Sequence, residues 1–282
     1  MSTLAFLAVM LAAALHATWN AIVKGGADKH LSMTALTIGQ GLPAIPLLAL
    51  WSPFPDASSW WLIAVSAVLH IGYQLFLLNA YRLGDFMQVY PIARGSAPLI
   101  VTLVSVTALG VALTGQQLLA IVLIASGIIA LGLVRRADGL RNPRAAALAL
   151  GTGCFIAGYS LVDGIGARAA GTGPGFYACA ALLNAAVFAV FMELRKPGVV
   201  KQSFTVARTT LLVGGVASFT AYCLVVWAFT LAPIALMTAL REVSIVFALV
   251  IGIVVFREPL NLVKVVTTMV TLAGVALMRL AR

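Results

Sequence analysis

Charged residues are scarce in this sequence. Only 9% of its 282 residues are Asp, Glu, Lys or Arg, whereas 62% are hydrophobic. An ordinary soluble protein needs far more charge to cover its surface. Long linkers and low-complexity tracts are also missing from the chain. The composition therefore predicts an integral membrane protein with no separate soluble catalytic domain.

Residues that commonly carry catalysis are equally sparse. The three histidines form no H-x-x-x-H pair, and no predicted span holds two paired carboxylates. Metal or acid/base catalysis has little support, so we expect no enzyme, no metal and no cofactor. No G-x-x-x-x-G-K-[ST] motif occurs, which excludes ATP as the direct energy source. Three cysteines are predicted to lie inside spans as small apolar packing residues, namely Cys154, Cys179 and Cys223.

Apolar stretches of about 20 residues recur along the whole chain, and each is long enough to cross a bilayer as a helix. Turn-forming or charged segments separate them, as at 52–59 and 193–201. The sequence therefore predicts an all-α membrane protein of ten transmembrane helices. They are expected at 3–23, 32–50, 59–82, 86–108, 116–134, 144–166, 174–194, 208–231, 234–256 and 260–279.

Basic residues are distributed unevenly between the predicted loops. Loops after the odd-numbered helices hold 13 of the 18 Lys and Arg, the opposite side holds three, and two lie inside spans. By the positive-inside rule, the odd-numbered loops are predicted to be cytoplasmic and both termini external. Lipid head groups suffice as partners for the net charge of +10, so no nucleic acid is expected.

The two halves of the chain resemble each other. Residues 79–101 align with 227–249, and 127–136 with 274–282, at an offset of 147 or 148. This offset spans five helices, an odd number, so equivalent segments enter the membrane from opposite sides. We therefore predict two inverted five-helix repeats, at 1–134 and 144–282, joined by a basic loop at 135–143. Because each chain supplies both halves, a functional monomer is expected.

Two motifs indicate a family. "HATWNAIVK" (16–24) and "FREPLN" (256–261) resemble the signatures of the EamA type of the drug/metabolite transporter superfamily. The aromatic and histidine residues of 59–82 are similar to those of bacterial amino-acid exporters of the YddG kind. The resemblance implies a ten-helix transporter of the bacterial inner membrane, with Trp19, Asn20 and Lys24 as a first-helix signature. The first half departs from the pattern, because Val111 aligns with Glu258.

Two arginines and one acid are predicted deep inside the membrane. Arg94 and Arg241 align in the two repeats, and both should face the repeat interface. A guanidinium there could clamp a substrate carboxylate through two parallel hydrogen bonds. Alternatively, Glu242 could neutralise one of the arginines in an internal ion pair. Residues 241 and 242 should point about 100° apart on a helix. Asp163 is predicted near the end of its helix, which leaves Glu242 as the deep carboxylate.

Polar side chains form stripes on several predicted helices. One stripe combines Ser66, His70, Tyr73 and Gln74, and another combines Tyr90 and Arg94 with Thr102 and Ser105; Tyr159 and Tyr222 lie on two further helices. Polar stripes avoid lipid, so they should line an interior cavity. Hydroxyls, guanidiniums and ring faces suit a small zwitterion with an apolar or aromatic side chain.

These features together predict a secondary transporter that exports small amphipathic metabolites by alternating access, with aromatic or neutral amino acids as the favoured substrates. Other metabolites or drugs are the alternative substrates. Energy could come from proton antiport through Glu242 or His70, or from facilitated diffusion without proton coupling. The predicted binding residues are Trp19, Asn20, His70, Tyr73, Gln74, Tyr90, Arg94, Tyr159, Tyr222 and Arg241.

Overall fold

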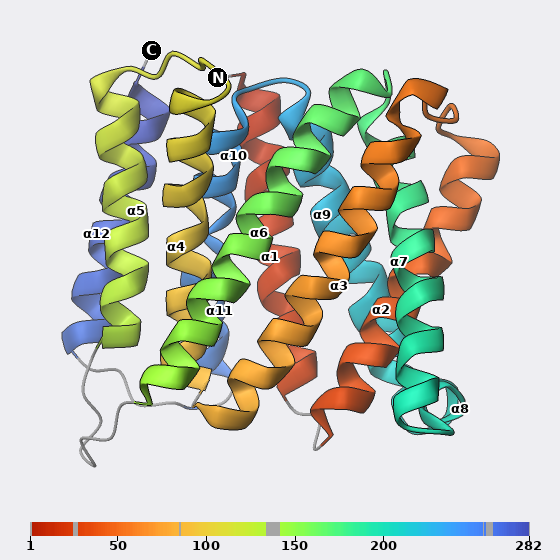
Figure 1. Cartoon of the computed structure of the whole chain (residues 1–282). Coiled ribbons are helices and arrows are strands. Elements are labelled where there is room, and N and C mark those ends of the chain that lie inside the picture. The colour runs from red at the N-terminus through yellow and green to blue at the C-terminus, as the bar shows by residue number, and fades with distance from the viewer. Residues whose placement is uncertain are drawn as a thin grey trace.

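The chain folds into a bundle of long helices (Figure 1). The computed structural model describes residues 2–24, 28–84, 86–133, 142–255, 257 and 262–281, and within them it is helical, without strands. The long helices of the first half are α1 (Thr3–Lys24), α2 (Lys29–Leu50), α3 (Trp60–Leu83), α4 (Phe86–Thr107) and α5 (Gly115–Leu133). The second half contains α6 (Pro143–Ala169), α7 (Gly173–Arg195), α8 (Val199–Thr205), α9 (Gly215–Phe229), α10 (Ile234–Arg241), α11 (Ser244–Val254) and α12 (Leu262–Leu280).

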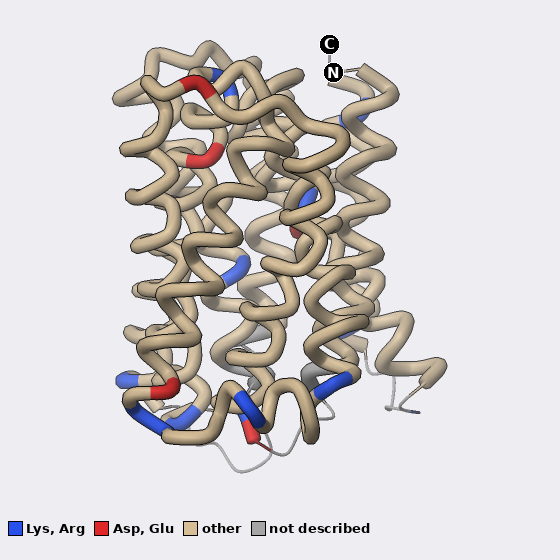
Figure 2. Tube along the Cα trace, turned by 90° about the vertical axis from the view of Figure 1, so that its right-hand side faces the viewer, with Lys and Arg blue, Asp and Glu red and all other residues tan. Residues whose placement is uncertain are grey.

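The described helices confirm an all-helical membrane protein. Nine helical stretches are long and apolar enough to cross a bilayer, and Gly115–Leu131 of α5 is a shorter apolar stretch. Successive long helices alternate in direction, and both termini lie at the same end of the bundle (Figure 1). We call this end the terminal end and the opposite one the basic end. Figure 2 shows Lys and Arg gathered at the basic end. Lys29 begins α2, Arg82 lies in the last turn of α3, and Lys196 follows the end of α7.

Two predicted spans are less regular than expected. The span predicted at 208–231 begins with a π-helical turn, Thr210–Gly214, before α9. The span predicted at 234–256 is broken at Glu242 and Val243 into α10 and α11. No Pro or Gly marks this break, so the apolar pattern of the sequence gave no sign of it. The short helix α8, which follows α7, was also not predicted.

Local sequence signals explain several helix starts. Asp28 caps α2 by accepting hydrogen bonds from the backbone N–H groups of His30 and Leu31 at 2.9 and 3.1 Å. Asn142 caps α6 in the same way, directly before Pro143. The Asp28 side chain also pairs with Lys196 at the end of α7. These contacts join the basic ends of α2 and α7.

Small residues let the helices approach closely. The most extensive contacts join α3 to α6, α5 to α12, α4 to α6, α4 to α5, α2 to α7 and α1 to α9. Where α2 crosses the π-helical turn that precedes α9, a Cβ on Gly39 would lie 2.0 Å from the backbone oxygen of Leu211. Only glycine fits such a contact, as is typical of helix pairs in membranes. Large apolar side chains such as Leu103 and Val190 remain exposed outside, where lipid would cover them.

Candidate functional site

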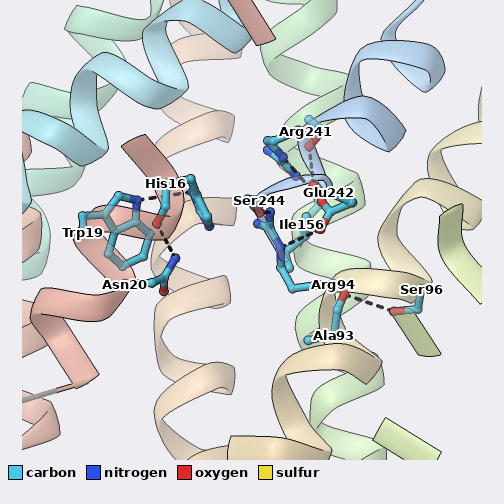
Figure 3. Close-up of polar contacts among 11 residues, drawn as sticks. His16, Trp19, Asn20, Ala93, Arg94, Ser96, Ile156, Arg241, Glu242 and Ser244 are labelled. Atoms are coloured by element: carbon cyan, nitrogen blue, oxygen red, sulfur yellow. Dashed lines mark hydrogen bonds and ion pairs between the residues drawn. The ribbon is translucent and has the colours of Figure 1, made fainter. Parts of the chain in front are cut away.

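A cluster of charged residues lies at the break between α10 and α11 (Figure 3). The Nε of Arg94, on α4, lies 2.8 Å from Oε2 of Glu242, and Nε of Arg241 lies 3.6 Å from Oε1. Arg94 Nη2 donates a hydrogen bond of 3.4 Å to Ser244 Oγ. Glu242 is fully buried. We call Arg94, Arg241, Glu242 and Ser244 the ionic cluster.

The two arginines of the ionic cluster are not equivalent. Arg94 makes the short contact with Glu242, although its Nε–H does not point at the carboxylate, so the pair is ionic rather than a linear hydrogen bond. Arg241 is 2% exposed, and its Nε and Nη2 have no hydrogen-bond partner in the described part of the chain. Its guanidinium lies over the rings of Tyr159 and Tyr222, at 6.0 and 5.5 Å. Two cations share one acid, so the cluster has an excess positive charge.

The break in the helix changes the geometry expected for residues 241 and 242. On a continuous helix their side chains would diverge by about 100°. In the structure Glu242 is the last residue of α10, and both of its oxygens lie within 4 Å of a guanidinium nitrogen. The ion pair that the sequence left as an alternative is therefore present for Arg94. For Arg241, contact with a substrate stays a prediction.

A second acidic cluster lies nearer the terminal end. Oδ2 of Asp163, on α6, accepts a hydrogen bond of 2.8 Å from the Tyr222 hydroxyl and lies 3.1 Å from Nε2 of His70. Asp163 is fully buried, and its Oδ1 has no partner in the described residues. We call His70, Asp163 and Tyr222 the histidine–aspartate cluster.

This burial corrects one expectation. Glu242 was predicted to be the deep carboxylate, but Asp163 is buried just as completely. The sequence places Asp163 near the end of α6, where water would be expected to reach it. Contacts from α3 and α9 cover it instead. The spacing of Tyr159 and Asp163, four residues apart on one helix face, was the available signal that both point inward.

Aromatic rings connect the two clusters. The His70 ring stacks on Tyr159 with centroids 4.1 Å apart, and Tyr222 meets both rings edge-on at 5.5 Å. Tyr73 approaches Tyr159 edge-on at 5.7 Å. Tyr177 of α7, which no pattern in the sequence marked as part of the site, contacts Tyr222 with ring centroids 4.9 Å apart. One layer of rings thus separates Arg241 from Asp163.

The first-helix signature faces the same interior. The Trp19 indole N–H donates to Nδ1 of His16 over 3.3 Å, and the Asn20 amide donates to the His16 carbonyl over 2.8 Å (Figure 3). Trp19 is 7% exposed. The side chain of Lys24 and the segment with Glu258 lie outside the described residues.

Two adjacent cavities lie among these side chains. The larger, which we call the Arg94 cavity, has a volume of about 260 Å³ and extends toward Lys29 at the basic end. The smaller, the Arg241 cavity, has a volume of about 50 Å³ and lies beside the histidine–aspartate cluster. Both are lined by His16, Trp19, Met33, Leu36 and Tyr73. Neither cavity wall includes an Asp or Glu side chain among the described residues.

The residues predicted to bind substrate converge on these cavities. Around the Arg94 cavity lie Trp19, Asn20, Tyr73, Tyr90 and Arg94. Around the Arg241 cavity lie Trp19, His70, Tyr73, Gln74, Tyr159, Tyr222 and Arg241. Glu242 lines neither cavity, since the two arginines cover it. Gln74 is held in place by donating to the Thr37 hydroxyl over 3.0 Å. Whether these residues bind a substrate stays a prediction.

Comparisons with known proteins agree with this architecture. Residues 3–133 match the EamA-like transporter family. No curated protein matches the chain. A solved structure described as "Crystal structure of protein" is 20% identical in sequence, with a TM-score of 0.78; the alignment covers 100% of this chain and 99% of that one. At this identity the likeness shows a shared fold.

Proposed function

We propose that this chain, whose residues 3–133 match the EamA-like transporter family, is a membrane transporter that exports small amphipathic metabolites across the bacterial inner membrane. Neutral and aromatic amino acids are the substrates we favour. Other metabolites or drugs, carried by the same mechanism, are the second candidate class. Transport proceeds by alternating access, with the substrate held between the two halves of the chain.

The observation that carries this proposal is that the guanidinium of Arg241 is buried without enough hydrogen-bond acceptors. A guanidinium that is 2% exposed, with two nitrogens lacking hydrogen-bond partners, is costly to bury. A substrate carboxylate in the Arg241 cavity would supply the missing acceptors in a bidentate pair. It would also give Arg241 an acid of its own, since Arg241 shares Glu242 with Arg94.

The cavity walls favour the rest of an amino acid as well. Ring faces of Tyr73, Tyr159 and Tyr222 offer an apolar surface with hydroxyl groups at its edge. Cationic residues and no carboxylates line both cavities in the described part of the chain, which disfavours a lipophilic cation. The aromatic wall therefore supports a substrate with a carboxylate and an apolar or aromatic side chain.

Helix directions support the two inverted repeats, 1–134 and 144–282. In Figure 1, α1 runs from the terminal end toward the basic end, whereas α6, its expected counterpart, runs the opposite way. Arg94 of the first half also meets Glu242 of the second. An interface of this kind suits alternating access, because the two halves can exchange conformations around a shared site. A single chain supplies both halves, so we propose a functional monomer.

The basic end belongs in the cytoplasm under this proposal, because Lys and Arg are retained on that side of the membrane. Both termini then lie outside. The Arg94 cavity, whose wall includes Lys29 at the start of α2, becomes the path from the cytoplasm. The Arg241 cavity lies deeper, toward the external side.

Counterflow in proteoliposomes tests the proposal. Vesicles are preloaded with a mixture of unlabelled amino acids, and uptake of labelled phenylalanine or leucine is measured. Arg241→Gln should lower exchange roughly tenfold or more, because charge-assisted hydrogen bonds to the carboxylate are lost. The matched control is Arg279→Gln, since Arg279 lies outside both cavities and contacts Thr3 at the terminal end. Arg279→Gln should exchange like the wild type.

Two results would contradict the proposal. Folded wild-type protein that exchanges none of the amino acids would direct the search to the second class of substrates. If Arg241→Gln protein exchanges as fast as the wild type, Arg241 does not bind the substrate carboxylate. Saturable exchange would further distinguish a carrier from a channel.

A further inference from the structure

Asp163 is a buried acid without a permanent cation. Its Oδ2 contacts a tyrosine hydroxyl and a histidine, both of which can be neutral, and its Oδ1 has no partner in the described residues. Glu242, in contrast, has a guanidinium on each oxygen. An ionised Asp163 is therefore incompletely compensated where it lies. A proton on the neighbouring histidine would complete the pair.

His70 lies between Asp163 and the Arg241 cavity. Its side chain is 14% exposed and forms part of the cavity wall, whereas Asp163 is behind it and does not line the cavity. A substrate ammonium entering this cavity would meet His70 before it could reach the acid. A proton, however, can bind the imidazole, and histidine is the side chain that titrates near neutral pH.

Other charged or titratable groups surround the pair from every packed helix. They are Tyr73 on α3, Tyr159 on α6, Tyr177 on α7, Tyr222 and Cys223 on α9, Arg241 on α10, and His16 across the cavity. Arg168 lies five residues after Asp163, near the end of α6. Arg168 is occupied by the backbone carbonyls of Phe229 and Ala232. Among the described residues, the cation that faces this aromatic layer with unpartnered nitrogens is Arg241, which lies over the rings of Tyr159 and Tyr222.

Charge balance links the two sites. With neutral His70, the charges on Arg94 and Arg241 balance those on Glu242 and Asp163. A carboxylate arriving at Arg241 adds a negative charge to this buried set, and a proton on His70 restores the balance. Binding of the carboxylate therefore strengthens binding of the proton, and binding of the proton strengthens binding of the carboxylate by the same factor.

We propose that His70 and Asp163 form a proton-binding site whose occupancy strengthens the binding of a carboxylate at Arg241. The inference rests on the proposed function, because it requires a carboxylate in the Arg241 cavity. The proton then travels in the same direction as the substrate. An inward proton gradient would oppose such an exporter, so the exporter runs on the gradient of its accumulated substrate.

The proton site is tested without any substrate. NMR spectra of protein labelled on the histidine rings are recorded in nanodiscs from pH 4 to 9. The ring resonances of His70 should change as the site takes up a proton, and Asp163→Asn should alter that change while leaving the ring resonances of His16 as they are in the wild type. His16 is the internal control, because no carboxylate contacts it in the described residues. A His70 resonance that does not titrate, or one that ignores Asp163→Asn, overturns the proposal.

The linkage is tested by binding to the wild type, which avoids any variant that fails to fold. Affinities for phenylalanine, 3-phenylpropanoate and phenethylamine are measured by calorimetry at pH 8 and pH 6. The two carboxylates should bind roughly fivefold or more tightly at pH 6, and phenylalanine should take up protons on binding. Phenethylamine, which lacks the carboxylate, should not gain affinity.

The outcomes separate this inference from the proposed function. Binding of the carboxylates with no pH dependence, or with proton release, overturns the linkage and leaves the proposed function intact. If none of the three compounds binds, amino acids fail as substrates and the linkage falls with them. The histidine titration then decides whether the proton site exists.

Discussion

The two buried carboxylates of this protein differ in what surrounds them. Glu242 lies between two guanidiniums at the break of a helix, and the arginines cover it from both cavities. Asp163 is buried equally well, but it contacts a histidine and a tyrosine hydroxyl. The same chemical group is thus held by permanent charges in one place and by neutral donors in the other.

This difference separates two roles. Protonation of Glu242 would leave two buried cations side by side, so the structure favours a permanent ion pair there. Beside Asp163, the two partners are a histidine and a tyrosine hydroxyl, neither of which carries a permanent charge. Of the two groups considered as proton carriers, His70 is therefore the one that we propose. Replacing each acid by its amide tests how far the two sites differ.

The largest effect is expected for Glu242→Gln. It leaves two guanidiniums buried without a carboxylate, which should lower the free energy of unfolding by about 3–5 kcal/mol. Thermal unfolding in detergent, followed by tryptophan fluorescence, measures the change. The double variant Arg94→Gln/Glu242→Gln should recover part of the loss. If Glu242→Gln alone is as stable as the wild type, Glu242 does not depend on its ion pairs, and the two acids do not differ in this respect.

An intermediate effect is expected for Asp163→Asn. The amide can still accept from Tyr222, and no permanent cation loses its partner, so about 1–3 kcal/mol should be lost. The same unfolding measurement applies, with Tyr222→Phe as a control that removes one hydrogen bond and costs about 1 kcal/mol. A loss larger than that of Glu242→Gln would reverse the comparison.

The smallest effect is expected for Asp28, a third carboxylate, at the basic end. The hydrogen bond from Lys196 and those from the α2 backbone lower the pKa of Asp28 below its ordinary value. The contribution of ionised Asp28 to the stability of the fold is therefore complete at neutral pH, above the unfolded-state pKa. It disappears as the pH falls through the folded-state pKa. Asp28→Asn keeps the helix cap and should cost less than about 1 kcal/mol near pH 7, since the pair is exposed. At pH 3 the variant and the wild type should differ less in unfolding temperature than at pH 7, and a constant difference would contradict this.

Much of the fold followed from residue pattern alone. Helix bounds such as 86–108 and 174–194 were predicted within a few residues, because a bilayer requires about 20 apolar residues per span. The break between α10 and α11 was not predictable in this way. Its residues, Arg241 to Ser244, carry no helix-breaking signal, and the turn is stabilised by contacts with Arg94 on another helix.

The candidate site was predictable in its members but not in its pairings. Polar stripes on apolar helices placed residues such as His70, Tyr159 and Arg241 toward the interior, because lipid cannot satisfy polar groups. Which of them contact each other depends on how the helices are rotated and how deeply they lie. The pairing of His70 with Asp163, 93 residues apart, arises from the packing of α3 on α6.

The sequence by itself determined that this is a membrane protein of many apolar helices, and that a few polar residues lie inside. That much depends only on transfer of side chains between water and lipid, which is a property of each residue and its neighbours along the helix. Only the tertiary structure decided which charge meets which. Ion pairing falls off over a few ångströms, so it depends on contacts between helices far apart in the chain. Those contacts gave Glu242 two cations and left Asp163 with a histidine.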